Sequence, residues 1–227
     1  MSTTASAPRL ERLPPGRHKL PREQVRENQR RRLLSAAAEV LAEQGYGGIT
    51  VTAVAAAAGV STGTLYKRFD GLWGCLLAAY EAGADRLCAE IELAGTAASR
   101  GQSAAAGIAR GLALLSAEPP LAKLLLTAPP TGAGALGAAR MRLAERLAAL
   151  LRGSRRSLGD SDQRELPAIA GAMALASIQL RGGGRLTDLA PTLAQVLLGP
   201  APREERRPQP ATSQARTRLP LSTVPSR

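Results

Sequence analysis

The sequence predicts an all-α protein, and three observations support this prediction. Apolar residues recur every three to four positions along most of the chain, as on the buried face of a helix. No stretch alternates apolar and polar residues with the two-residue period of a strand. Glycine and proline interrupt the apolar pattern at intervals of helical length. Packed helices are therefore the expected architecture.

The first helix is expected at residues 25–44. Leu33, Ala37, Val40 and Leu41 fall on one face of this segment, while charged residues fall largely on the other. Gly45 follows directly and is expected to end the helix.

The stretch TVTAVAAAAGVSTGTLYKRF at residues 50–69 predicts two short helices joined by a tight turn. Thr50 is placed to cap the first helix and Ser61 to cap the second. Gly59 lies where the first helix must stop in a left-handed conformation. Ala55 supplies the small residue that two steeply crossing helices need at their contact. The interval from Ala55 to Gly59 is the spacing of helix-turn-helix units.

Val60 and Leu65 are expected to fill the core between these two helices, which leaves small, hydroxyl and cationic groups facing outward. Such a helix suits DNA, because its first residues can enter the major groove while its later residues hold phosphates. The expected DNA-binding residues are Thr50, Thr52, Ser61, Thr62, Gly63, Thr64, Tyr66, Lys67 and Arg68. An ordinary helical hairpin in a core is the alternative.

From about Gln24 to Tyr80 the chain resembles the DNA-binding domain of the TetR (tetracycline repressor-like) transcriptional regulators, and GVSTGTLYKRF is the most specific part. The resemblance implies an N-terminal three-helix helix-turn-helix DNA-binding domain and a C-terminal helical ligand-binding and dimerisation domain. Two positions depart from the family pattern. Leu72 stands where the family usually has a phosphate-contacting Lys, and Thr52 where a charged residue is common.

Further helices are expected after the DNA-binding unit. Asp70 can cap a helix that starts near Leu72 and continues to about Ala98. Pro119 and Pro120 are expected to close the helix that follows. The remaining segments are 103–117, 121–126, 135–151, 162–180 and 188–198.

Small side chains gather at residues 167–177 and would let another helix approach closely. The family resemblance implies a dimer through the last two helices, so we interpret this face as the dimer seam. The alternative is an internal helix pair.

The net charge of +12 is concentrated near the two ends of the chain. Residues 1–32 hold nine Lys or Arg against three Glu, and residues 200–227 hold six Arg against two Glu. This balance favours a polyanionic partner. The expected divisions are a basic flexible arm (1–24), the helix-turn-helix domain (25–71), the ligand-binding and dimerisation domain (72–199) and a disordered basic proline-rich tail (200–227).

Other classes of protein are less well supported. No signal peptide or membrane span is recognisable, so a cytoplasmic protein is expected. Cys75 and Cys88 lie thirteen positions apart on one expected helix, too far to pair, and are interpreted as apolar fillers. Catalysis, a metal and a cofactor are not expected, because the only histidine is His18 in the arm and no phosphate-binding loop or metal-ligand spacing occurs.

The leading hypothesis is a ligand-responsive transcriptional regulator, most often a repressor in this family, whose partners are a palindromic double-stranded DNA operator, a second copy of the chain and a small-molecule effector. Residues 99–199 contain no aromatic or histidine, which indicates a largely apolar ligand without identifying its contacts. Two alternatives remain. The C-terminal domain could serve only dimerisation or a protein partner, or the chain could be an all-α enzyme.

Overall fold

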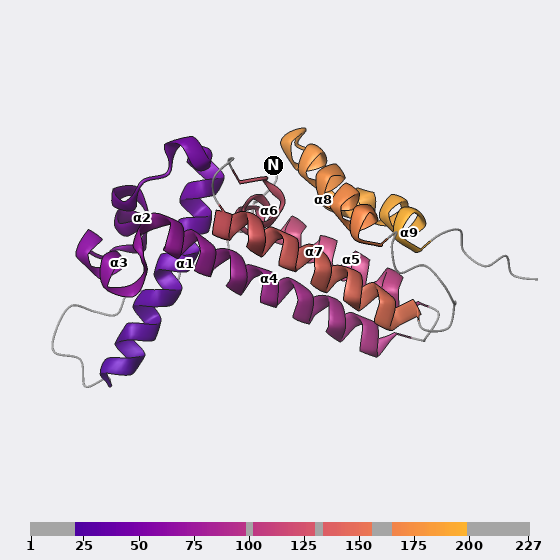
Figure 1. Ribbon diagram of the computed structural model, residues 1–227, viewed down its shortest axis with the longest axis horizontal. Helices are drawn as coiled ribbons and strands as arrows, with labels where there is room; N and C mark the ends of the chain where they lie inside the picture. The colour runs from indigo at the N-terminus through magenta and orange to yellow at the C-terminus, as the bar shows by residue number, and fades with distance from the viewer. Residues whose placement is uncertain (1–20, 99–101, 130–133, 156–164, 199–227) are drawn as a thin grey trace, which may run out of the picture.

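The computed structural model describes residues 21–98, 102–129, 134–155 and 165–198, and the described residues form helices without any strand (Figure 1). The all-α prediction is confirmed. The helices are α1 (Arg22–Gly48), α2 (Val51–Ala58), α3 (Thr62–Arg68), α4 (Gly71–Ala97), α5 (Ser103–Ala117), α6 (Pro119–Leu126), α7 (Gly134–Arg155), α8 (Glu165–Arg181) and α9 (Ala190–Leu198), with a 3-10 turn, η1 (Leu186–Leu189), before α9.

Helices α1, α2 and α3 form a cluster at one end of the molecule (Figure 1). Its core contains Leu33 and Leu41 of α1, Val54 of α2 and Leu65 of α3, which are all buried. Gly45 adopts φ 67° and ψ 178°, so regular helix stops there as expected. The helix begins at Arg22, three residues earlier than expected, and the end of the segment expected to be a flexible arm is therefore helical.

Helix α4 connects this cluster to the rest of the molecule. Its 27 residues span about 40 Å, and α5 and α7 pack along it. Two glycines allow neighbouring helices to come close. A Cβ on Gly83 would lie 2.6 Å from the Leu121 side chain of α6, and one on Gly107 of α5 would lie 3.0 Å from Ile91 of α4. Helices α8 and α9 cover the opposite side of α5, α6 and α7 (Figure 1).

Three local expectations were wrong in detail. Helix α6 begins at Pro119, two residues earlier than expected, because proline lacks an N–H and is well suited to the first turn of a helix; α5 ends at Ala117, before the prolines, as expected. Asp70 occupies the position before α4, but its side chain makes no capping hydrogen bond. The segment expected as a helix from residue 188 starts with η1. The expected start at residue 162 lies outside the described residues, as do residues 1–20 of the arm and the tail.

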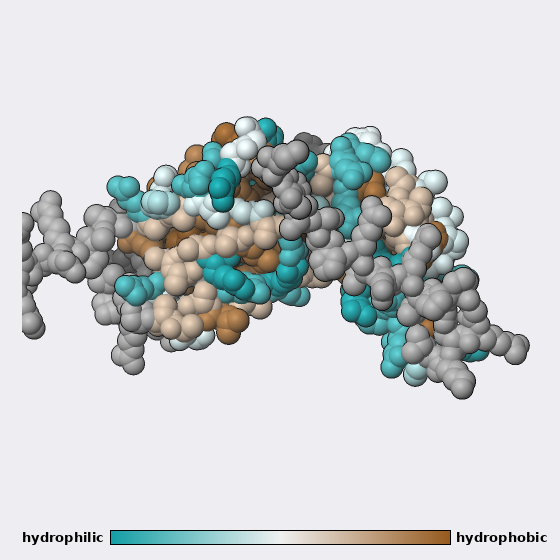
Figure 2. Space-filling view, turned by 180° about the vertical axis from the view of Figure 1, so that it is seen from behind, coloured by the Kyte–Doolittle hydropathy of each residue, from teal (hydrophilic) through white to brown (hydrophobic). Residues whose placement is uncertain are grey.

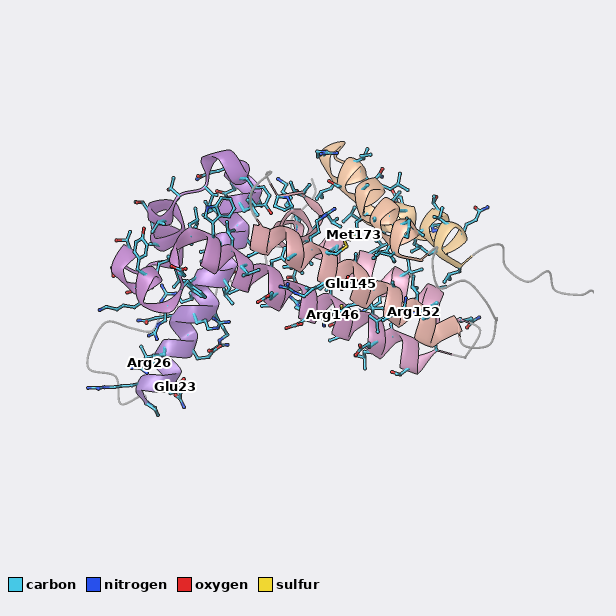
Figure 3. All side chains as sticks on the ribbon, viewed as in Figure 1. Glu23, Arg26, Glu145, Arg146, Arg152 and Met173 are labelled. Atoms are coloured by element: carbon cyan, nitrogen blue, oxygen red, sulfur yellow. The ribbon has the colours of Figure 1, made fainter. Side chains whose placement is uncertain are left out.

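Exposed ion pairs connect α4 to α7. Arg142 contacts Glu81 at 2.9 Å and Arg146 contacts Asp85 at 2.6 Å; Arg146 is marked in Figure 3. Surface pairs of this kind contribute about 0–1 kcal/mol each, so apolar packing holds these helices together. None of the described helices is long and apolar enough to cross a membrane.

Candidate nucleic-acid interface and internal cavity

The two short helices after α1 are capped as the sequence predicts. The Thr50 hydroxyl accepts a hydrogen bond from the Ala53 N–H at 3.1 Å, and the Ser61 hydroxyl accepts one from the Thr64 N–H at 3.2 Å. Each cap satisfies a backbone donor that the helix leaves free at its N-terminus. The starts of α2 and α3 are therefore set by their own sequences.

The turn between α2 and α3 depends on Gly59, which adopts the left-handed conformation at φ 62° and ψ 40°. The N–H groups of Gly59 and Val60 donate to the carbonyls of Ala56 and Ala55, each at 2.9 Å. This is the hydrogen-bond pattern of a Schellman motif, in which glycine avoids the strain that a side chain would add. The tight helix-turn-helix connection follows from this glycine.

The outer surface of α3 is mostly accessible. Tyr66 is 61% exposed, Lys67, Thr62 and Gly63 are also exposed, and Thr64 is half-buried with its hydroxyl 3.0 Å from that of Ser61. Thr50, Thr52 and Ser61 are exposed beside them. The fully buried Leu65 anchors the opposite face of α3.

Arg68 differs from the outward-facing position expected for it. Its side chain is half-buried and turns to α1, where Nη2 donates to Gln29 Oε1 at 3.1 Å. A second arginine, Arg32 of α1, donates to the carbonyls of Ala58 and Gly59 at the end of α2. Cations are favourable at this negative end of a helix. Arg32 is one of the charged residues that the sequence pattern puts largely opposite the apolar face of residues 25–44, and that pattern gives no sign of this contact.

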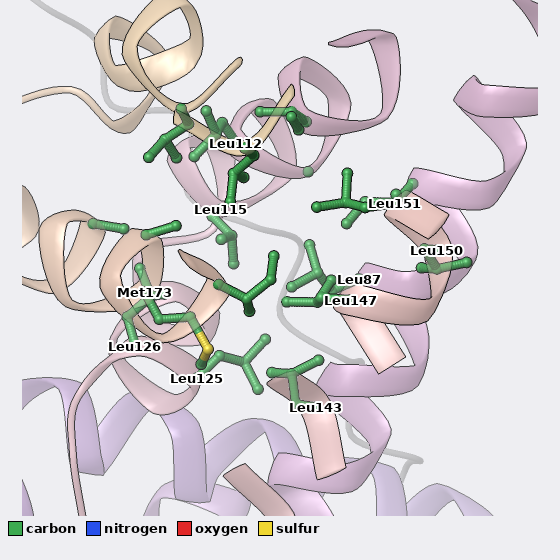
Figure 4. Close-up of a pocket in the computed structure, with 18 residues that line it drawn as sticks. Leu87, Leu112, Leu115, Leu125, Leu126, Leu143, Leu147, Leu150, Leu151 and Met173 are labelled. Carbon is green, nitrogen blue, oxygen red and sulfur yellow. The ribbon is translucent and has the colours of Figure 1, made fainter. Parts of the chain in front are cut away.

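An apolar cavity of about 100 Å³ lies among helices α4 to α9. Figure 4 shows leucines and Met173 converging on it from several helices. Every lining side chain is aliphatic or a methionine or glycine. The lining residues are Leu87, Ile91, Ile108, Gly111, Leu112, Leu115, Leu125, Leu126, Leu143, Leu147, Leu150, Leu151, Ile169, Ala172, Met173, Ala176, Leu193 and Leu197.

Helix α6 contacts both the cavity and α1. Leu125 and Leu126 line the cavity, and their carbonyls accept hydrogen bonds from Arg140 Nη1 at 3.0 and 3.1 Å. In the last turn of the same helix, Lys123 Nζ donates to the carbonyl of Ala42 in α1 at 2.7 Å. A displacement of α6 would therefore be transmitted to α1.

The small residues of α8 divide between two faces. Gly171 is exposed and has open space around it, whereas Ala172 is buried and lines the cavity. Leu175 and Ile178 are 42% and 58% exposed on α8, and Val196 is 53% exposed on α9. Only part of the 167–177 segment can thus form an outer seam. In Figure 2, the half of the molecule away from α1–α3 carries broad apolar areas.

The capped helices, the glycine turn and the exposed face of α3 define an all-α helix-turn-helix protein. Residues 33–79 match the sequence model of the bacterial regulatory proteins of the tetR family. The helix-turn-helix domain of this chain belongs to that family, and the chain is a DNA-binding transcriptional regulator. No curated protein sequence matches the chain significantly.

Solved structures of similar fold include regulators with the same all-α architecture. The fatty acid degradation regulator FadR of Bacillus halodurans has a TM-score of 0.63 at 20% identity, covering 75% of this chain and 95% of its own. FadR of Bacillus subtilis, solved in complex with stearoyl-CoA, has a TM-score of 0.61 at 20% identity, and the match covers 75% of this chain and 98% of that one. The TetR-family regulator PfmR of Thermus thermophilus has a TM-score of 0.53 at 22% identity, and the match covers 74% of this chain and 98% of that one. These likenesses extend the fold match to α4–α9.

Proposed function

We propose that the protein is a repressor that binds a palindromic DNA operator as a homodimer and is released by a small molecule with an aliphatic chain. Helices α1–α3 would read DNA, and the helices from residue 72 to 199 would bind the effector and dimerise. The observation that carries this proposal is the aliphatic cavity, because it is connected through α6 to α1.

The exposed face of α3 supports roles for its side chains on DNA. Thr62 and Thr64, at the front of the helix, would face base edges, and Tyr66 and Lys67 would bind phosphates. Gly63 would let the backbone come close to the groove. The remaining proposed contacts are Thr50, Thr52, Ser61 and Arg68, of which Arg68 would have to leave Gln29 to reach DNA.

The chemistry of the cavity supports an aliphatic ligand. A buried polar group without a partner costs about 1–3 kcal/mol, and this cavity offers no polar side chain to provide one. A hydrocarbon chain loses no hydrogen bonds when it enters the cavity, and the transfer of its apolar surface out of water is favourable. The stearoyl-CoA bound to FadR of Bacillus subtilis supports a fatty acyl chain as that hydrocarbon.

The size of the cavity supports a coupling between ligand and DNA. Binding sites for ligands of drug size occupy about 300–1,000 Å³, several times the volume of about 100 Å³ found here. A long chain would therefore push the surrounding helices apart. Because Lys123 of α6 is hydrogen-bonded to α1, part of that movement would be transmitted to the helix-turn-helix. It would change the separation of the two copies of α3, the recognition helix, in the dimer.

Thermal unfolding tests the ligand part of the proposal. Stearoyl-CoA at about 100 times its dissociation constant should stabilise the folded protein by about 2.7 kcal/mol. For a chain of this size, each kcal/mol of stabilisation raises the Tm by roughly 2–4 °C. Acetyl-CoA is the matched control, because it has the same polar part without the long chain. Equal shifts with both compounds, or none with either, would refute an acyl-chain effector.

A further inference from the structure

A row of arginines lies on the first turns of α1, before the residues that match the tetR family. The match begins at residue 33, whereas α1 begins at Arg22. Arg22, Arg26 and Arg30 follow one another at four-residue intervals, which places them along one side of the helix. All three are exposed. Figure 3 shows Arg26 near the free end of α1, which projects away from the body of the molecule.

This projecting segment is fixed to the recognition helix at its base. The Arg30 guanidinium lies over the Phe69 ring, 5.4 Å from the ring centre, and Gln29 holds Arg68. The row from Arg22 to Arg30 therefore starts beside the C-terminal end of α3 and extends about 12 Å from it. Its position relative to α3 is set by these packed contacts.

The two outer arginines have no partner among the described residues. The side chains of Arg22 and Arg26 take part in no hydrogen bond or ion pair there. Arg31, two and a half turns from Arg22 and so on the opposite side of the helix, lies 3.8 Å from Glu27. The charges of Arg22 and Arg26 are thus available to an external anion, and the DNA backbone is the anion nearest to α3 when this helix is bound.

We propose that Arg22 and Arg26 bind backbone phosphates beside the half-site that α3 reads, so that α1 extends the DNA interface beyond the helix-turn-helix. The inference rests on the proposed DNA-binding function. These phosphate contacts would lie outside the residues that match the tetR family. They would compensate for Leu72, which is apolar and half-buried at the start of α4, where the family usually has a phosphate-contacting Lys.

Binding to duplex DNA at several salt concentrations tests the proposal. The probe is a duplex that the unaltered full-length protein selects from a random-sequence library. The double variant Arg22→Gln/Arg26→Gln should lower the salt slope of log K by about two units, since each phosphate contact contributes about 0.9. Sequence preference should not change, and hydroxyl-radical protection should be lost only outside the half-site. Arg31→Gln is the matched control on the same helix.

The outcomes separate this inference from the proposed function. The inference would be overturned if the double variant kept the salt slope and the footprint of the unaltered protein. It would also be overturned if Arg31→Gln lowered the salt slope as much as the double variant does. If Lys67→Ala also leaves the slope unchanged, DNA binding by α3 fails as well. If only Lys67→Ala lowers the slope, α3 binds DNA and the arginine row does not. Far-ultraviolet circular dichroism confirms that each variant is folded, which is expected because the substituted side chains are exposed.

Discussion

At the scale of single residues, the side chains on α3 divide into those that would hold the DNA backbone and those that would read bases. Lys67 is an exposed cation in the last turn of α3, and Thr62 is an exposed hydroxyl at its start. A phosphate contact contributes affinity on every sequence, whereas a base contact contributes only on the correct one. The two groups can be separated by measurement.

Lys67→Ala should weaken binding to all duplexes alike and lower the salt slope by about one unit. Thr62→Ala should instead change which sequences are selected from a random library, with the slope nearly intact. Fluorescence anisotropy across salt concentrations and library selection measure both effects. The assignment of roles is wrong if Lys67→Ala alters sequence preference and keeps the slope.

Cys75 should make the protein sensitive to alkaline pH. Burial raises the pKa of this thiol from 9.0 to about 11, because the thiolate is poorly solvated in the core. The unfolded chain then loses this proton at lower pH than the folded one, so the contribution to stability is complete below about pH 9 and is lost as the pH rises through about 11. Urea unfolding at about pH 8 and about pH 11 should show a smaller fall in the free energy of unfolding for Cys75→Ala. An equal fall in both proteins would contradict this assignment.

At the scale of elements, the sequence predicted what short stretches determine. The caps at Thr50 and Ser61 and the left-handed Gly59 involve groups within a few positions of one another, and each is confirmed. The inward turn of Arg68 depends on Gln29 of α1, 39 positions away, and has no local signal. The sequence could not distinguish cavity-lining leucines from filled core, because both recur at helical spacing.

The wall of the cavity formed by α8 can be tested by filling it. Ala176 is buried and lines the cavity, so the three extra carbons of Ala176→Leu would enter the empty space. The Tm of the free protein should change little, while the rise caused by stearoyl-CoA should be lost. Ala174→Leu, at an exposed position on the same helix, is the matched control and should keep that rise. A full ligand-induced rise in Ala176→Leu would show that the ligand binds elsewhere.

At the scale of the whole molecule, two copies are needed for the proposed operator. One seven-residue helix reads too little DNA to be specific alone, and a palindrome matches the symmetry of a two-fold dimer. The exposed apolar residues of α8 and α9 offer a surface for that dimer. We therefore expect the outer face of α8, rather than its cavity face, to form the seam.

Gly171→Arg should dissociate the dimer without disturbing the monomer. A Cβ at Gly171 meets nothing within 4 Å, so a long side chain fits in the monomer but would hold two copies of α8 apart. An unpaired charge buried in the seam would add several kcal/mol to the cost. Light scattering should report a monomer, and operator affinity should collapse while weak non-specific binding survives. Gly137→Arg, at an equally open glycine of α7, is the control. A dimeric Gly171→Arg protein would place the seam elsewhere.

The most direct test of the account is the operator affinity of the intact dimer with and without a saturating acyl ligand. Coupling energies of about 1–3 kcal/mol correspond to about 5- to 150-fold changes in affinity. We predict that stearoyl-CoA weakens binding to the selected duplex within this range, and that the duplex weakens stearoyl-CoA binding by the same factor, as linkage requires. A ligand that raises the Tm but leaves operator affinity unchanged would contradict the claim that the cavity controls DNA binding.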